Sequence, residues 1–202
     1  MKKLRPSSED EMILEFLGME IQSHRFQEKM TDVLDEMGLG RDIILNGDIA
    51  SVKENALRKE ILGQFRGYGK DAELFKDFPK QVEWWWSVFD GDDLSKIRYI
   101  DYSYWNELSN YSGSPIEAAK TIKSGKTIYD VPNDNFIEIA RKLRAGHIFP
   151  PMIFLTDKAE SRYVILEGHA RMTGYGLYPE AFRDVSVLLG YCVGSELDKW
   201  NG

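Results

Sequence analysis

The feature that most constrains this chain is an apolar run that passes through a short glycine-containing turn into a helical pattern. The run covers residues 162–166, the turn covers 167–171 and reads EGHAR, and the helix is expected at 172–177. The first backbone N–H groups of such a helix lack partners and lie at the positive end of its dipole. The turn therefore favours an anion, above all a phosphate.

Each residue of this turn has a candidate role. The amides of Gly168, His169 and Ala170 can cradle an oxyanion, because glycine lets a ligand approach the backbone closely. Arg171 adds a fixed positive charge that suits phosphate. His169 is also a candidate acid–base group, and Glu167 is a candidate general base or magnesium ligand.

Structural roles for the same residues stay open. Gly168 and Arg171 also suit a tight turn in which the arginine pairs with an acidic neighbour. His169 also suits a helix cap or a packing position, where the helix N-terminus lowers the pKa of its imidazole. Glu167 also suits a surface carboxylate at a strand end that pairs with Arg171.

Composition narrows the class of protein. The chain has 202 residues, is 43% hydrophobic and has a formal net charge of -7, so we expect a packed core and disfavour a general nucleic-acid binder. It has no apolar run long enough to span a bilayer and no signal-peptide pattern. The single cysteine, Cys192, cannot form an internal disulfide, and three histidines without ligand spacing predict no metal site. We therefore expect a cytoplasmic location.

Helical patterns dominate up to about residue 90. Capping boxes at Ser8 and Ser51 each precede apolar residues at helical spacing, and Gly67 ends the second of these helices. A further helix is expected around 30–37 and a short strand at 41–45. The Trp84-Trp85-Trp86 run is interpreted as packing of these helices onto the rest of the chain; in a helix its three side chains point in different directions, so a partner surface or a base-stacking platform stays an alternative.

The pattern becomes mixed after residue 90. Strands are expected at 98–102, 152–155, 162–166 and 184–192, and helices after Ser114-Pro115 and after Asn133 or Asp134. We therefore expect an α+β protein with two domains, a mainly helical N-terminal extension over 1–97 and an α+β domain over 98–202.

The order of elements resembles the ParB/sulfiredoxin-like fold. A helix that ends in Gly146 is followed by Phe149-Pro150-Pro151, two strands, Gly168-His169-Ala170-Arg171 and a helix, and the resemblance covers roughly residues 98–192. In that superfamily the motif reads G-x-x-R, so Gly168 and Arg171 match, and the resemblance implies that Arg171 helps hold nucleotide phosphates.

The sequence departs from the enzymes of that superfamily. His169 stands where sulfiredoxins have cysteine, and Ala170 stands where sulfiredoxins and free serine kinases have histidine. Glu167 falls where the serine kinases have aspartate. In the preceding helix, Lys142 and Glu138 replace the small hydroxyl residues of sulfiredoxins, and Lys142 is a candidate phosphate ligand. ParB proteins have a helix-turn-helix domain after this fold, whereas only residues 194–202 follow here.

The resemblance and the turn together favour binding of a nucleotide or another phosphorylated small molecule. If the protein is an enzyme, phosphoryl transfer or nucleotide hydrolysis is the expected class, with a nucleoside triphosphate and magnesium as cofactors. The alternative is a non-enzymatic ParB-like regulatory module that binds nucleic acid or a protein partner.

Overall fold

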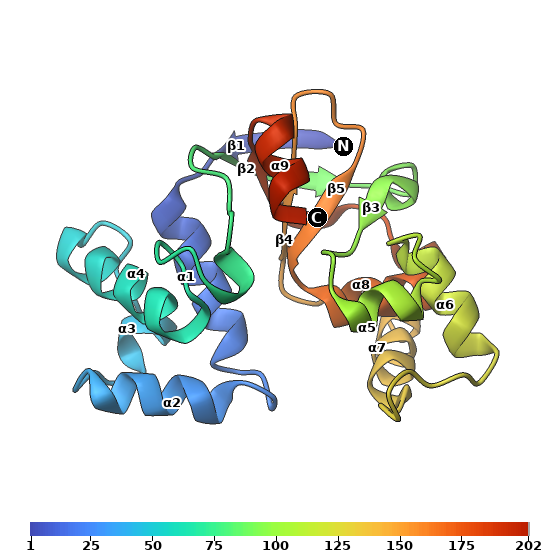
Figure 1. The fold of residues 1–202 in the computed structure, drawn as a ribbon, viewed down its shortest axis with the longest axis horizontal. Coiled ribbons are helices and arrows are strands. Elements are labelled where there is room, and N and C mark those ends of the chain that lie inside the picture. Colours follow the sequence, from blue (N-terminus) through green and yellow to red (C-terminus); the bar gives the residue numbers. More distant parts are fainter. Residues whose placement is uncertain (202) are drawn as a thin grey trace.

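The computed structural model describes residues 1–201. A single six-stranded mixed sheet combines strands from both halves of the chain (Figure 1). The strand order is β1-β2-β6-β4-β5-β3. The β6–β4 and β5–β3 pairs are parallel, and the other pairs are antiparallel. The strands are β1 (Lys2–Pro6), β2 (Glu83–Phe89), β3 (Ile97–Arg98), β4 (Met152–Thr156), β5 (Tyr163–Glu167) and β6 (Val185–Tyr191). The α+β class predicted from the sequence is confirmed.

The centre of the sheet is buried on both faces, whereas the edge strand β1 is exposed. Along β5, Val164 and Leu166 belong to one apolar cluster, while Tyr163 and Ile165 belong to the other. Because successive side chains of a strand point to opposite faces, a strand covered on both sides needs an unbroken apolar sequence. This explains why residues 163–166 form a continuous apolar run instead of an alternating one.

The N-terminal helices cover one face and form the first apolar cluster with it. They are α1 (Glu9–Glu20), α2 (Gln27–Glu36), α3 (Asp42–Leu45) and α4 (Val52–Arg66). The predicted N-caps are confirmed, because the hydroxyls of Ser8 and Ser51 accept hydrogen bonds from the backbone amides of Glu11 and Glu54. Gly67 ends α4 with a φ of 83°, a conformation that glycine adopts without strain.

The opposite face is covered by helices from the second half of the chain. They are α5 (Ser103–Leu108), α6 (Pro115–Lys123), α7 (Asp134–Arg144) and α8 (His169–Leu177), while α9 (Gly194–Asn201) joins the first cluster through Leu197. Short 3-10 turns lie at η1 (Glu73–Phe75), η2 (Asp93–Lys96) and η3 (Pro179–Ala181). The Ser114 cap is confirmed. At α7 the Asn133 side chain instead donates to the Lys126 carbonyl.

Three secondary-structure predictions were wrong, and one helix was not predicted. The tryptophan run is a strand, β2, so the helical direction argument does not apply to it. Residues 41–45 contain helix α3, and the strand predicted at 98–102 is the two-residue β3. Residues 194–202 contain helix α9, which the sequence patterns did not indicate. For the tryptophan run and for residues 98–102, strand pairing in the tertiary structure overrides local preference, because a strand needs a partner that the local sequence does not identify.

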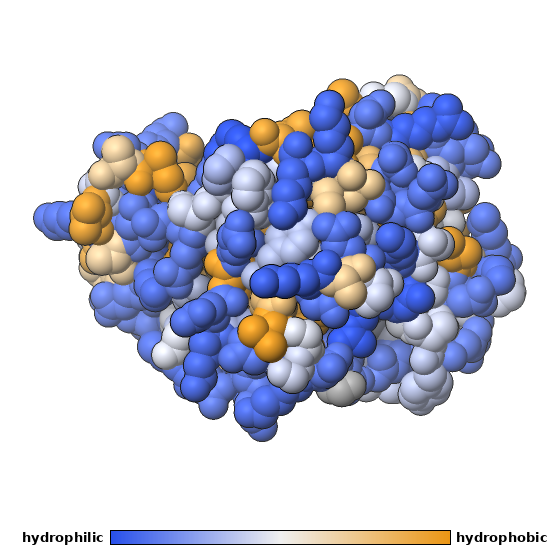
Figure 2. Space-filling view, turned by 90° about the horizontal axis from the view of Figure 1, so that it is seen from above, coloured by the Kyte–Doolittle hydropathy of each residue, from blue (hydrophilic) through white to orange (hydrophobic). Residues whose placement is uncertain are grey.

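The sheet crosses the division that we predicted between 97 and 98. Strands β1 and β2 precede the division, and β2 pairs with β6, which follows it. Strand β3 spans the division itself. Whether 1–97 and 98–202 fold as separate units stays a prediction. The face seen in Figure 2 is mostly hydrophilic, with apolar side chains in small separate groups.

Candidate functional site

A cleft of about 1150 Å³ lies between the N-terminal helices and the helices of the second half. In Figure 1 these two groups lie on opposite sides below the sheet. One wall comes from the end of α1, the α1–α2 loop, the end of α4 and the η1 region. The other comes from α5, the start of α7 and the start of α8, and α9 contributes Lys199 and Trp200. Residues 167–171 all line this cleft.

The N-terminus of α8 presents free hydrogen-bond donors to the cleft. Within residues 1–201 the backbone amides of His169, Ala170 and Arg171 have no acceptor, and no side chain caps the helix. Gly168 precedes them with a φ of 105°, and a Cβ there would lie 2.5 Å from Cγ of Met152. The glycine is therefore required by the strand-to-helix turn itself, and the free amides are a suitable site for an anion.

His169 is a neutral and unpartnered imidazole in this cleft. Burial lowers its pKa to about 3, and the positive charges of Arg66, Arg171 and Arg25 add to that effect. Its Nε2 atom is shielded from solvent and has no hydrogen-bond partner among the described residues. A neutral imidazole offers one donor and one acceptor, so His169 can bind a polar ligand group but does not carry a proton at neutral pH.

Aromatic rings surround His169. Its ring is nearly parallel to that of Trp105 at 5.2 Å and to that of Tyr99 at 6.1 Å, and Trp105 and Tyr99 stack at 4.8 Å. The hydroxyls of Tyr99 and Thr173 form a hydrogen bond with each other. The Thr173 hydroxyl also donates to the His169 carbonyl, and this bond anchors the first turn of α8. Trp105 lines the cleft beside Tyr104, whose shielded hydroxyl has no partner within residues 1–201. The aromatic wall thus combines flat surfaces with unused polar atoms.

Arg171 is held by the protein itself. Its Nη1 donates to the carbonyls of Pro150 at 2.7 Å and Pro151 at 3.0 Å, and its Nη2 pairs with the Glu167 carboxylate. The pairing of Arg171 with Glu167, which the sequence left open as a structural role, is confirmed. These bonds tie the start of α8 to the Pro-Pro turn and occupy much of the donor capacity of the guanidinium.

Two charged residues on the opposite wall were missed by the sequence analysis. Glu20, at the end of α1, is 6% exposed, and Arg66, at the end of α4, lies 4.0 Å away. Burial raises the pKa of the Glu20 carboxyl to about 7, and the negative charge of Glu167 adds to this, although Arg66, Arg25 and Arg171 oppose it. The Arg66 Nε atom is buried without a partner among the described residues.

One sequence signal pointed to Glu20. It lies seven, four and three residues after Ile13, Phe16 and Leu17, so it occupies the apolar face of α1 at helical spacing. A carboxylate on that face is buried only at a cost, and such groups are frequent at functional sites. Its proximity to α8 depends on tertiary packing and had no signal in the sequence.

Lys142 is not brought to the cleft. Its ammonium lies 3.9 Å from the Glu138 carboxylate on α7, and it is absent from the residues that line the cleft. Glu138 also forms an ion pair with Arg141 on the same exposed side of α7. Within residues 1–201, no cluster of three or more histidine, cysteine, aspartate or glutamate side chains is arranged to hold a metal ion.

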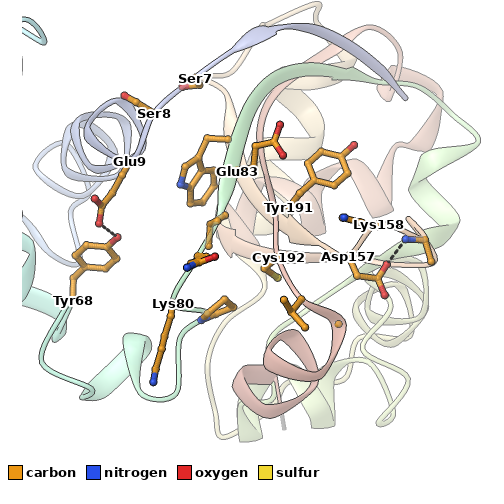
Figure 3. A pocket seen from close by; sticks show the side chains of 17 residues that line it. Ser7, Ser8, Glu9, Tyr68, Lys80, Glu83, Asp157, Lys158, Tyr191 and Cys192 are labelled. Carbon is orange, nitrogen blue, oxygen red and sulfur yellow. Dashed lines mark hydrogen bonds between the residues drawn. The ribbon is translucent and has the colours of Figure 1, made fainter.

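A second depression, of about 1080 Å³, lies near β2 and the end of β6 (Figure 3). In Figure 3 the Tyr68 hydroxyl donates to the Glu9 carboxylate. The Asp157 carboxylate accepts hydrogen bonds from the backbone amides of Ala159 and Glu160. Burial raises the pKa of the Cys192 thiol there to about 12, which keeps the sulfur protonated and unreactive.

Comparison with protein-family models, with curated proteins and with solved structures finds no match. None of the helices within residues 1–201 has the length and apolar character that a membrane crossing requires. The function is therefore argued from the cleft alone.

Proposed function

We propose that the cleft binds a nucleotide or another phosphorylated small molecule, with a phosphate at the N-terminus of α8. One observation carries the proposal: residues 169–171, whose backbone amides have no acceptor within residues 1–201, line the same cleft as Arg66 and Arg25. Backbone donors and helix dipole favour an anion, and a guanidinium suits phosphate in particular. The buried Arg66 Nε without a partner supports a role for this residue in the binding of that anion.

The aromatic wall favours a nucleotide among phosphorylated ligands. Trp105 and Tyr104 offer flat apolar surface next to the phosphate position, and a base can stack on such surfaces. The Tyr104 hydroxyl and the His169 imidazole then supply hydrogen bonds to the base or the sugar. In this arrangement Arg171 and Glu167 hold the start of α8 in place, and the amides of residues 169–171 form the cradle.

Catalysis by this site, if it occurs, belongs to phosphoryl transfer or nucleotide hydrolysis. Magnesium takes phosphate oxygens and water as ligands and needs only one or two carboxylates from the protein. Glu167 lines the cleft and is the candidate for that role or for a general base, at the expense of its pairing with Arg171. We also propose that residues 98–192 form a ParB/sulfiredoxin-like core, which the order α7, β4, β5, α8 supports, and that the protein is cytoplasmic.

Thermal-shift measurements with nucleotides, sugar phosphates and inorganic phosphate, with and without magnesium, test the proposal. Specific binding should raise the melting temperature at micromolar to millimolar ligand concentration. Calorimetry on Arg66→Gln should then show affinity for the same ligand reduced about ten- to a hundredfold, since a charged hydrogen bond contributes about 1.5–3 kcal/mol.

Lys142→Gln is the matched control, because Lys142 lies outside the cleft. It should bind within about twofold of the wild type. The proposal is wrong if no phosphorylated compound raises the melting temperature, or if Arg66→Gln and Lys142→Gln bind equally well.

A further inference from the structure

Glu20 is a buried carboxylate with few partners. It is 6% exposed, its side chain accepts no hydrogen bond within residues 1–201, and its nearest cation is Arg66 at 4.0 Å. That distance is too long for a hydrogen bond. Because a buried charge without hydrogen bonds is unfavourable, this carboxyl group readily takes up a proton.

The charged groups around Glu20 come from four elements. Arg25 follows α1, Arg66 ends α4, Glu167 ends β5 and Arg171 lies in the first turn of α8. His169 lines the same cleft but is neutral, because its pKa is lowered to about 3. Glu167 is neutralised largely by its ion pair with Arg171, so among these groups Arg25 and Arg66 are the cations able to balance an added anion. Lys76 and Lys199 also line the cleft.

We propose that Glu20 and the anion at the N-terminus of α8 share one proton, so that the cleft binds an anion together with a proton. The inference rests on the proposed function and adds a pH-dependent selectivity to it. Two anionic groups close together in one cleft repel each other, and a single proton shared between them relieves that repulsion. That proton comes either from Glu20 or from the anion.

The source of the proton makes the affinities of two anions of the same shape and charge depend differently on pH. Hydrogen phosphate is a tetrahedral dianion that retains a proton above neutral pH, whereas sulfate is a tetrahedral dianion with none. Hydrogen phosphate can therefore donate to an ionised Glu20. Sulfate, like a fully ionised phosphate monoester, requires that Glu20 be protonated.

The test is calorimetric titration of the full-length chain with inorganic phosphate and with sulfate at about pH 7.5 and about pH 9. Sulfate affinity should fall by about tenfold per pH unit, since one proton is taken up, while phosphate affinity should change less than about threefold. Glu20→Gln supplies an amide donor without a titratable proton. In that variant the fall in sulfate affinity with pH should disappear.

Glu15→Gln is the matched control. Glu15 is half-buried on the same helix, and burial likewise raises the pKa of its carboxyl, but it does not line the cleft. This variant should keep the wild-type fall in sulfate affinity with pH. Melting curves of both variants establish that they are folded.

The outcomes separate this inference from the proposed function. If phosphate and sulfate show the same pH profile, or if Glu20→Gln keeps the fall in sulfate affinity, proton sharing is wrong while phosphate binding stands. If neither anion nor any nucleotide binds the wild type, the proposed function fails and this inference fails with it.

Discussion

At the scale of single residues, the G-x-x-R turn has a structural role that can be assigned from its contacts. Gly168 faces Met152 so closely that any side chain would clash, and its φ of 105° is strained for other residues. Arg171 joins α8 to the carbonyls of the Pro-Pro turn and to Glu167. These contacts place the free amides of α8 in the cleft, whether or not Arg171 touches a ligand.

Arg171→Ala should therefore lower stability as well as any ligand affinity. It removes the hydrogen bonds to Pro150 and Pro151 and leaves the partly buried Glu167 carboxylate unpaired, so we expect the free energy of unfolding to fall by about 2–4 kcal/mol. Urea unfolding measures this. Arg141→Ala, which removes an exposed ion pair on α7, should lower the free energy of unfolding far less, because solvent screens that pair. Equal stability of the two variants would contradict the bracing role.

At the scale of elements, strand β2 shows how neighbouring tryptophans have different environments. Trp84 is 4% exposed and belongs to the first apolar cluster. Trp85 points to the other face, is partly exposed and lies 4.6 Å from the ammonium of Lys3. Strand alternation produces this difference between adjacent positions.

Trp84→Ala and Trp85→Ala should consequently have unequal effects. Replacement of the buried Trp84 leaves a large cavity between the sheet and the N-terminal helices, and we expect a loss of about 3–5 kcal/mol. Replacement of Trp85 removes a partly exposed ring and a cation–π contact, for which we expect about 1–2 kcal/mol. Chemical denaturation of both variants measures these losses in the free energy of unfolding. A larger loss for Trp85→Ala than for Trp84→Ala would place the strand in the opposite register.

At the scale of the whole molecule, one sheet separates two apolar clusters. The first contains residues of α1, α2 and α4 together with Ile153, Leu155 and Val164 from the centre of the sheet. The same helices also form one wall of the cleft. Stability and the candidate site thus depend on the same packing of residues 1–66 against residues of the second half.

Deletion of residues 1–66 should cause aggregation. It uncovers the apolar sheet face and also removes β1, which leaves β2 as an unprotected edge strand. Size-exclusion chromatography and binding of a hydrophobic dye measure the effect, with the full-length chain as reference. A soluble fragment 67–202 that melts cooperatively would show instead that 1–66 is an independent accessory unit.

The sequence alone was sufficient for the local features of this protein. The caps at Ser8, Ser51 and Ser114 and the passage from β5 through Gly168 into α8 were predicted correctly. Each depends on residues within a few positions of one another, where hydrogen-bond preferences and glycine geometry act directly. The backbone amides without acceptors at the start of α8, within residues 1–201, follow from the same local geometry.

The tertiary structure alone decided which distant residues meet. The tryptophan run is a strand because β1 and β6 pair with it, and Lys142 lies outside the cleft because its face of α7 is exposed. Glu20 and Arg66 face α8 only because the N-terminal helices pack on the far side of the same cleft. Strand pairing and burial depend on contacts between segments far apart in the chain, so no local pattern identifies them.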